Sequence, residues 1–182
     1  MKRILLSAAL SLFVASMSFA QEKTPDELKA EREVLKDERK SEAYQERQKK
    51  LAELKDPGST SVGSIDALAA SSTTALLETK KNNELLPELY KRTVGETVDG
   101  VTDVTVKKPT LDELLAVSEG ILKTTKAVAA SSLEIAKAQG DIKSAGMLKA
   151  AKATKSVNYS KDVNSLLGAE LSYQGKLISN LI

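Results

Sequence analysis

Residues 110–139 read TLDELLAVSEGILKTTKAVAASSLEIAKAQ, and this stretch decides the fold. Apolar residues recur in it at the three- and four-residue spacing of one helix face. This stripe consists of Leu114, Val117, Ile121, Val128, Ile135 and Ala138, with Thr124 and Ser131 at the remaining positions. A second row widens the face and consists of Leu115, Leu122, Ala129 and Ala136. Because so wide an apolar face needs more than one neighbour, the stretch predicts the middle helix of a bundle.

The two ends of this helix are not equally well defined. Thr110 can cap the first turn while Glu113 reaches back to it, which is the pattern of a capping box. At the other end, Gly140 could stop the helix, yet Ile142 and Ala145 keep the phase of the stripe. A second candidate break lies at Asn158 to Ser160. Whether the helix stops at Gly140 or continues to Ala145 decides between three long helices and four shorter ones.

The preceding segment predicts the first helix of the bundle, over Ser64 to Arg92 with Ser64 as its N-cap. Pro87 lacks an N–H and would clash with the carbonyl of the residue four positions earlier. We therefore expect a kink or a short break at Pro87.

Residues 93–108 have a different character, because valines alternate with threonines around an Asp99-Gly100 pair. The pair suits a type I′ turn, so a small hairpin is one interpretation and an irregular connection is the other. In a hairpin with that turn, Glu96 would lie opposite Asp103, which is an unfavourable pairing.

Residues 1–20 have the pattern of a cleaved secretory signal peptide. Lys2 and Arg3 precede an uncharged run from Ile4 to Met17, and Ser18-Phe19-Ala20 fits a cleavage site. The run is shorter than the roughly 18 residues that a membrane span needs. We therefore expect an exported chain, in the periplasm, at the cell surface or released. The absence of cysteine from the whole sequence favours a bacterial source.

Residues 21–56 are densely charged in both signs and predict a long N-terminal helix. Thr24 and Glu27 form a second capping box, with Pro25 at the first helical position. Its apolar residues do not share one face, so we expect it to protrude or to pair over short patches. It is either an arm that contacts a partner or a solvated leader. Residues 57–63 read as a linker, and 64–182 as the bundle domain.

Composition limits the chemistry that the chain can perform. There is no His and no Cys, which excludes Ser-His-Asp triads, cysteine nucleophiles and His- or Cys-ligated metal or haem centres. No glycine-rich phosphate loop is present. Loss of Lys2 and Arg3 with the signal peptide leaves 25 basic residues against 25 acidic ones, so nucleic-acid binding has little electrostatic support. We expect no enzyme, no metal and no cofactor.

The C-terminal segment carries a ridge of small residues. The ridge consists of Ser165, Gly168, Ser172, Gly175 and Ser179, spaced alternately three and four apart. Glycine is unfavourable inside a helix by about 1 kcal/mol relative to alanine, so the two glycines call for an explanation. Close approach of another helix, within the bundle or from a second copy, is one explanation, and a weakly packed polar face is the other.

Together these patterns predict an all-α protein in which a charged helix precedes an antiparallel bundle of three or four helices with coiled-coil-like spacing. The predicted function is non-enzymatic protein–protein contact in the bacterial cell envelope, as a scaffold, an adaptor or a holding protein. Its partners would be other envelope proteins or a second copy of the chain. The alternative is a membrane-active or lipid-binding helical protein that contacts the membrane peripherally.

Overall fold

A computed structural model describes residues 23–98, 101–103 and 107–182. The predicted signal peptide at 1–20 and the predicted turn at Asp99-Gly100 lie outside these residues. The described part is helical apart from one short hairpin. In chain order its elements are α2 (Pro25–Lys40), α3 (Glu42–Glu53), α4 (Gly63–Val94), β1 (Glu96–Val98), β2 (Val101–Asp103), α5 (Leu111–Ser144) and α6 (Met147–Leu181).

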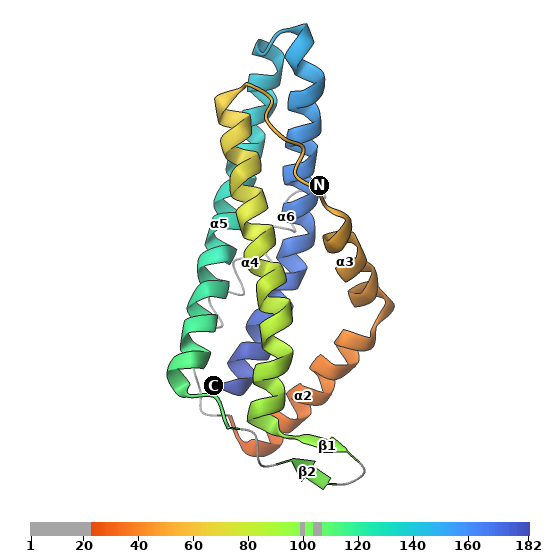
Figure 1. The fold of residues 1–182 in the computed structure, drawn as a ribbon, viewed down its shortest axis with the longest axis vertical. Helices are drawn as coiled ribbons and strands as arrows, with labels where there is room; N and C mark the ends of the chain where they lie inside the picture. Colours follow the sequence, from red (N-terminus) through yellow and green to blue (C-terminus); the bar gives the residue numbers. More distant parts are fainter. Residues whose placement is uncertain (1–22, 99–100, 104–106) are drawn as a thin grey trace.

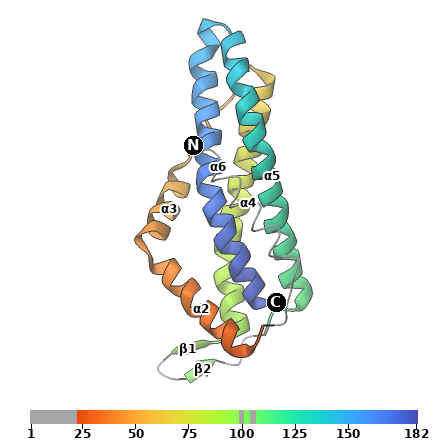
Figure 2. The ribbon, with the colours of Figure 1, turned by 180° about the vertical axis from the view of Figure 1, so that it is seen from behind.

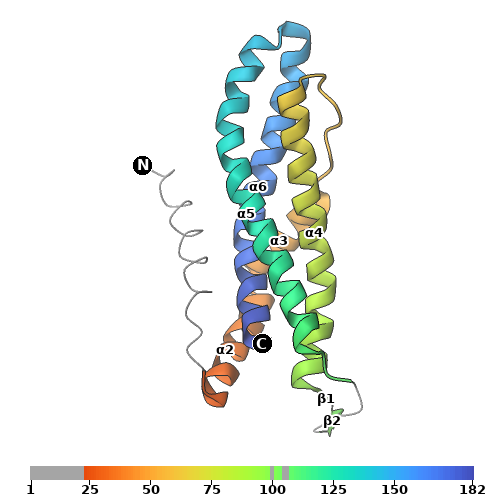
Figure 3. The same ribbon diagram turned by 90° about the vertical axis from the view of Figure 1, so that its left-hand side faces the viewer.

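Three long helices form the body of the molecule (Figure 1). Helices α4, α5 and α6 lie side by side along the long axis and alternate in direction, so that α5 is antiparallel to both others. The same arrangement is seen from behind in Figure 2 and from the side in Figure 3. The predicted all-α antiparallel bundle is confirmed, and it contains three long helices rather than four shorter ones.

Helix α5 begins as the sequence predicts. Thr110 accepts a hydrogen bond from the Glu113 backbone N–H, while the Glu113 carboxylate accepts one from the Thr110 N–H at 2.7 Å. The predicted stripe faces the core, with Leu114, Ile121 and Val128 all buried. The helix continues through Gly140 and ends at Ser144.

The break between α5 and α6 lies at Gly146, where the backbone has φ 76°. Glycine reaches this left-handed region without the penalty that a Cβ imposes. Helix α6 then runs unbroken from Met147 to Leu181, so the candidate break at Asn158 to Ser160 does not form. Both Tyr159 and Ser160 are buried in the helix, and Ser160 donates its hydroxyl to the Ser156 carbonyl as an interior helical residue can.

Helix α4 departs from the prediction at its start. Val62 occupies the N-cap position and makes no side-chain capping bond, so Ser64 is not the cap. Instead, the Ser64 hydroxyl donates to the Asp141 carboxylate on α5 at 2.6 Å. The helix passes through Pro87 without a break, and the Asn83 carbonyl loses the N–H that another residue at 87 would supply.

The valine-rich segment forms a small antiparallel hairpin at one end of the bundle (Figure 1). Its two three-residue strands pair in the predicted register, with Glu96 opposite Asp103 and Val98 opposite Val101. Of the two interpretations of residues 93–108, the structure therefore bears out the hairpin.

The core has two apolar regions with polar side chains between them. The larger region surrounds Leu86, Ile121 and Leu171, and the smaller one surrounds Ile65 and Val157 near the opposite end. At the edge of the larger region, Asn164 on α6 donates to the Val128 carbonyl and pairs with the Ser131 hydroxyl at 2.7 Å. The polar atoms of Asn164 and Ser131 are thus hydrogen-bonded inside the core, whereas the buried Ser156 hydroxyl on α6 has no hydrogen-bond partner among the described residues.

The second apolar row of α5 is covered only in part. Leu122 and Ala129 are half-buried, whereas Leu115 and Ala136 are exposed. Neighbours α4 and α6 cover the main stripe, which confirms that α5 has more than one partner. The outer row remains mostly at the surface.

The N-terminal charged segment is two helices and not one. Helix α2 begins at the predicted Thr24 capping box and ends at Lys40, and Ser41 is both its C-cap and the N-cap of α3. The Ser41 hydroxyl accepts from the Tyr44 N–H at 3.2 Å and donates to the Glu38 carbonyl. The break resets the helical phase, so Leu35 and Leu51, which would face different ways on one helix, are both buried. The expectation of one long helix is therefore wrong.

Candidate interaction site

Helices α2 and α3 together form an arm that runs antiparallel to α6. Arg32 on the arm bonds to Asn180 near the C-terminus, and Arg47 bonds to Glu170 further back on α6. The arm buries the apolar side chains of Leu35, Tyr44 and Leu51 against the bundle. The surface shared by the arm, α6 and α4 is the candidate interaction site.

The centre of the site is an ion pair that water does not reach freely. Arg47 donates from Nε to the Glu170 carboxylate Oε2 at 2.7 Å, and the side chains are 12% and 0% exposed. Glu38 lies 4.0 Å from Arg47 Nη2, which is too far for a hydrogen bond. Among the described residues, Arg47 Nη2 and Glu170 Oε1 have no hydrogen-bond partner. The pair is therefore buried but only half satisfied.

Two tyrosines pack beside this pair. The rings of Tyr44 on α3 and Tyr173 on α6 meet edge to face with centroids 5.0 Å apart, and the Arg47 guanidinium lies 5.0 Å from the Tyr44 ring centroid. Burial, with a smaller effect from Tyr44, raises the pKa of Tyr173 to about 12. Burial also raises the pKa of Tyr44, and the nearby Glu170 carboxylate adds to this. Both tyrosines are therefore held neutral.

Amide side chains link the arm to α4. Gln174 on α6 donates to the Thr79 carbonyl at 2.9 Å and to the Asn83 side chain at 2.6 Å. Asn83 in turn donates to Gln48 on the arm at 2.9 Å. Gln48 Nε2 has no hydrogen-bond partner within the described part of the chain. The network reaches the arm but leaves its last donor unused.

The lower end of the arm is fixed by Asn180. This residue accepts from Arg32 Nε at 2.7 Å and donates to the Leu28 carbonyl and to the Glu31 carboxylate, both at 3.0 Å. A hydrogen bond from Lys23 is the main cause that lowers the pKa of Glu31, and the bond from Asn180 adds to it. Polar contacts therefore hold both helices of the arm.

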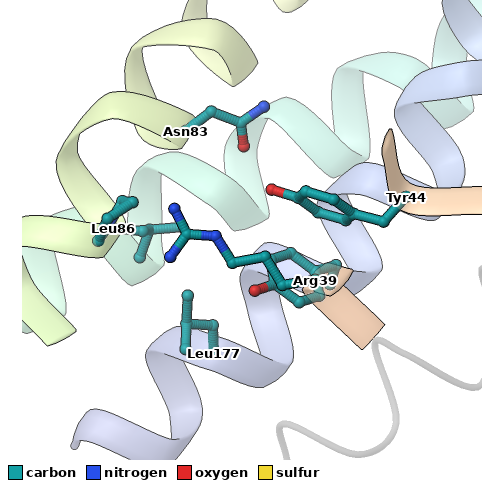
Figure 4. Close-up of a pocket in the computed structure, with 7 residues that line it drawn as sticks. Arg39, Tyr44, Asn83, Leu86 and Leu177 are labelled. Carbon is teal, nitrogen blue, oxygen red and sulfur yellow. The ribbon is translucent and has the colours of Figure 1, made fainter. Parts of the chain in front are cut away.

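The arm bows away from the bundle between its two attachment points. Residues 32 to 47 span about 22 Å of ideal helix, whereas the matching residues 170 to 180 of α6 span about 15 Å. The break at Ser41 absorbs the excess length, and the elbow is visible in Figure 1. Beneath it lies a hollow of about the size of one water molecule. Figure 4 shows Arg39 reaching between Asn83 and Leu177 there, with Tyr44 beside it.

A short linker joins the arm to α4 and is ordered by Asp66. The Asp66 carboxylate accepts from the Thr60 hydroxyl and N–H at 2.6 and 2.7 Å and from the Ser59 hydroxyl at 2.7 Å. These hydrogen bonds, the Thr60 hydroxyl first, lower the pKa of Asp66 to about 2. Asp56 at the start of the linker accepts from the Thr73 hydroxyl on α4. The arm thus ends in a defined tether.

The predicted ridge of small residues lies on the other side of α6 from much of this site. Ser165 and Ser179 are exposed, Gly168 and Ser172 are half-buried, and Gly175 is buried. A Cβ added at Gly168 would meet no neighbouring atom within 4 Å, so no helix of the described bundle approaches closely there. Contact between copies through the ridge stays a prediction.

The sequence patterns do not single out Arg47, Glu170 or Gln174, although α6 carries a signal for two of them. Residues 163, 167, 170, 174, 177 and 181 follow one apolar stripe at alternating spacings of four and three, and Glu170 and Gln174 occupy two of its positions. A charged residue on a core stripe is rarely buried without a partner. Arg47 carries no comparable signal, because it is one of many arm cations.

Within the residues that the structure describes, no helix combines the length and the apolar character needed to cross a membrane. The chain matches no family model, and comparison with curated proteins and with solved structures likewise finds no significant match.

Proposed function

We propose that this chain is an exported, non-enzymatic bacterial protein that works by protein–protein contact in the cell envelope, with the α2–α3 arm as its contact element. The observation that carries this proposal is the polar attachment of the arm. Its central ion pair is buried yet incompletely bonded, and a buried ion pair adds little to stability compared with apolar packing. The polar part of the attachment therefore specifies where the arm lies and adds little to how strongly it is bound.

The outer face of the arm supports the same role. Val34 on α2 is 67% exposed among charged neighbours, whereas Leu35 next to it is buried. Val34 therefore gives a partner protein an accessible apolar position on the outer face of the arm. The signal-peptide pattern of residues 1–20 supports export.

Site-specific photo-crosslinking in the cell envelope tests the proposal. A photoreactive residue at Val34 on the arm should form crosslinks to a defined envelope protein. The same residue at Lys126, which is exposed on α5, serves as the matched control and should not. Crosslinks to phospholipid at Val34, together with flotation of the purified mature chain on anionic vesicles, would instead favour the lipid-binding alternative. Crosslinks of equal yield at both positions would contradict a role for the arm.

A further inference from the structure

The surface beneath α3 has the properties of a binding groove and not merely of a core. It presents the Glu170 carboxylate, the ring of Tyr173 and the amides of Gln174 and Asn83 on two parallel helices, α6 and α4. Leu86 and Leu177 supply its apolar floor near the elbow (Figure 4). An amphipathic helix that brings a cation, an aromatic ring and a leucine would complement this set.

The arm fills this groove imperfectly. Three buried polar atoms at the junction have no hydrogen-bond partner among the described residues, namely Arg47 Nη2, Gln48 Nε2 and Glu170 Oε1. A guanidinium can bind a carboxylate through two parallel hydrogen bonds, yet here one is formed. A helix that is not bent at an elbow or tied to a linker is free to adopt the better geometry.

The arm is also built to leave as a unit. It is joined to α4 by residues 54–62, which include Pro57 and Gly58. This linker is not helical, so neither α3 nor α4 extends into it. Leu35, Tyr44 and Leu51 are the apolar side chains that it buries in the described structure, while most of its surface is charged and exposed. Release of the arm would leave the main stripes of α4, α5 and α6 packed against one another.

We infer that the groove around Glu170 is a binding site for an amphipathic helix of a partner protein, and that the arm occupies this site until the partner displaces it. The partner helix carries a tyrosine, an arginine three residues later and a leucine seven residues after the tyrosine, as Tyr44, Arg47 and Leu51 do. The inference deepens the proposed function, on which it rests. Charge complementarity at Glu170 selects the arginine. Lys176 on α6, which lies 3.8 Å from Glu38 of the arm while the arm is in place, favours an acidic residue at the matching position of the partner helix.

A labelled peptide tests this site in the full mature chain. The probe is residues 41–55, SEAYQERQKKLAELK, and its binding is followed by fluorescence anisotropy. The wild-type arm competes with the probe, so an Arg47→Met chain, whose arm is loosened, should bind it about tenfold more tightly than the wild type or better. A Leu51→Ala chain loosens the arm through a different contact and should behave in the same way.

Matched controls separate the groove from general stickiness. A Lys50→Met chain changes an exposed cation on the same helix and should bind the probe as the wild type does. An Arg47→Met change in the probe should lower its affinity for the Arg47→Met chain about tenfold or more, because the probe then brings no guanidinium to Glu170.

Equal affinity of the probe for all of these chains would overturn the inference. So would a wild-type chain that doubles its mass in solution through exchange of arms, because the occupant would then be a second copy. If the probe fails to bind while the crosslinks at Val34 persist, the groove is wrong and the proposed contact function of the arm survives.

Discussion

Replacement of the two partners of the buried ion pair, separately and together, gives the sharpest test of how the arm is held. Arg47→Met removes the cation, Glu170→Met removes the anion, and methionine keeps an unbranched side chain of similar length in each place. The wild-type contact is 2.7 Å long between Arg47 Nε and Glu170 Oε2. The quantity of interest is the free energy of arm release.

The two single substitutions should differ in cost because the two partners differ in burial. Arg47→Met leaves the fully buried Glu170 without its cation, and breaking a buried pair in this way typically costs about 3–5 kcal/mol. Glu170→Met leaves Arg47, which keeps some exposure and has Glu38 4.0 Å away, so we expect a loss of about 1–3 kcal/mol. The double variant should lie within about 1 kcal/mol of the wild type or above it, because buried pairs replaced by apolar residues are often neutral or stabilising.

Native-state hydrogen exchange of the α3 amides measures release of the arm, and urea unfolding measures the stability of the bundle. If the free energy of arm release in the wild type is smaller than the decrease expected for Arg47→Met, the α3 amides of that variant will lose all protection while the bundle stays folded. Lys50→Met is the control, because Lys50 forms an exposed pair with Glu46 on the same helix, and such pairs contribute about 0.3–0.5 kcal/mol. A loss in Arg47→Met no larger than in Lys50→Met, or a double variant no better than Arg47→Met, would refute the reasoning.

Further predictions concern helix α6, its N-terminal junction, the linker and the buried tyrosine. Gly168→Ala should stabilise the chain by about 0.5–1 kcal/mol, because its Cβ would enter open space inside a helix. Gly146→Ala should destabilise the chain by about 1–2 kcal/mol through backbone strain at φ 76°. Urea unfolding measures both free energies of unfolding, and changes of the same sign in the two variants would contradict this. The folded-state pKa of Asp66 is lowered from 3.8 to about 2, so its contribution to stability is present above about pH 4 and is lost as the pH falls through about 2. An NMR titration of the Thr60 amide should show a midpoint near pH 2. A midpoint near pH 4 would be inconsistent with the linker hydrogen bonds. The folded-state pKa of Tyr173 is raised from 10 to about 12, so its contribution to stability is complete below about pH 10 and is lost as the pH rises through about 12. Ultraviolet titration should find a tyrosine that ionises near pH 12. If no tyrosine ionises so late, Tyr173 is not buried in this way.

The bundle could be predicted because local and tertiary preferences agree in α5. Thr110 and Glu113 cap its first turn, and the stripe through Ile121 and Val128 meets two neighbouring helices. The same agreement located the start of α2 at Thr24. The sequence did not decide where α5 ends, because either of two glycines could end it. Gly140 lies inside the helix, whereas Gly146 follows its end and has a positive φ that is favourable for glycine.

The break at Ser41 is harder to find because its flanking residues are all good helix formers. The evidence was the change of phase between Leu35 and Tyr44, which sequence analysis interpreted as a helix without a common face. A serine that caps a new helix explains the change, since each half then has its own apolar face. A loss of phase in the apolar residues of a charged helix thus has two interpretations. The helix is either exposed, or bent so that both halves pack on one surface.

The polar residues of α6 decide where that surface lies. The arm contributes Leu35, Tyr44 and Leu51 to the main apolar core, but leucines packed between helices can slide by one helical turn with little loss of packing. Glu170 and Gln174 remove that freedom, because a shift of the arm by one turn, about 5.4 Å, would separate Arg47 from a carboxylate that water cannot reach. The register is therefore fixed by the cost of wrong positions and not by strong attraction in the right one. A polar contact of this kind contributes more to the specificity of the attachment than to its strength, which is the combination that the proposed displacement of the arm requires.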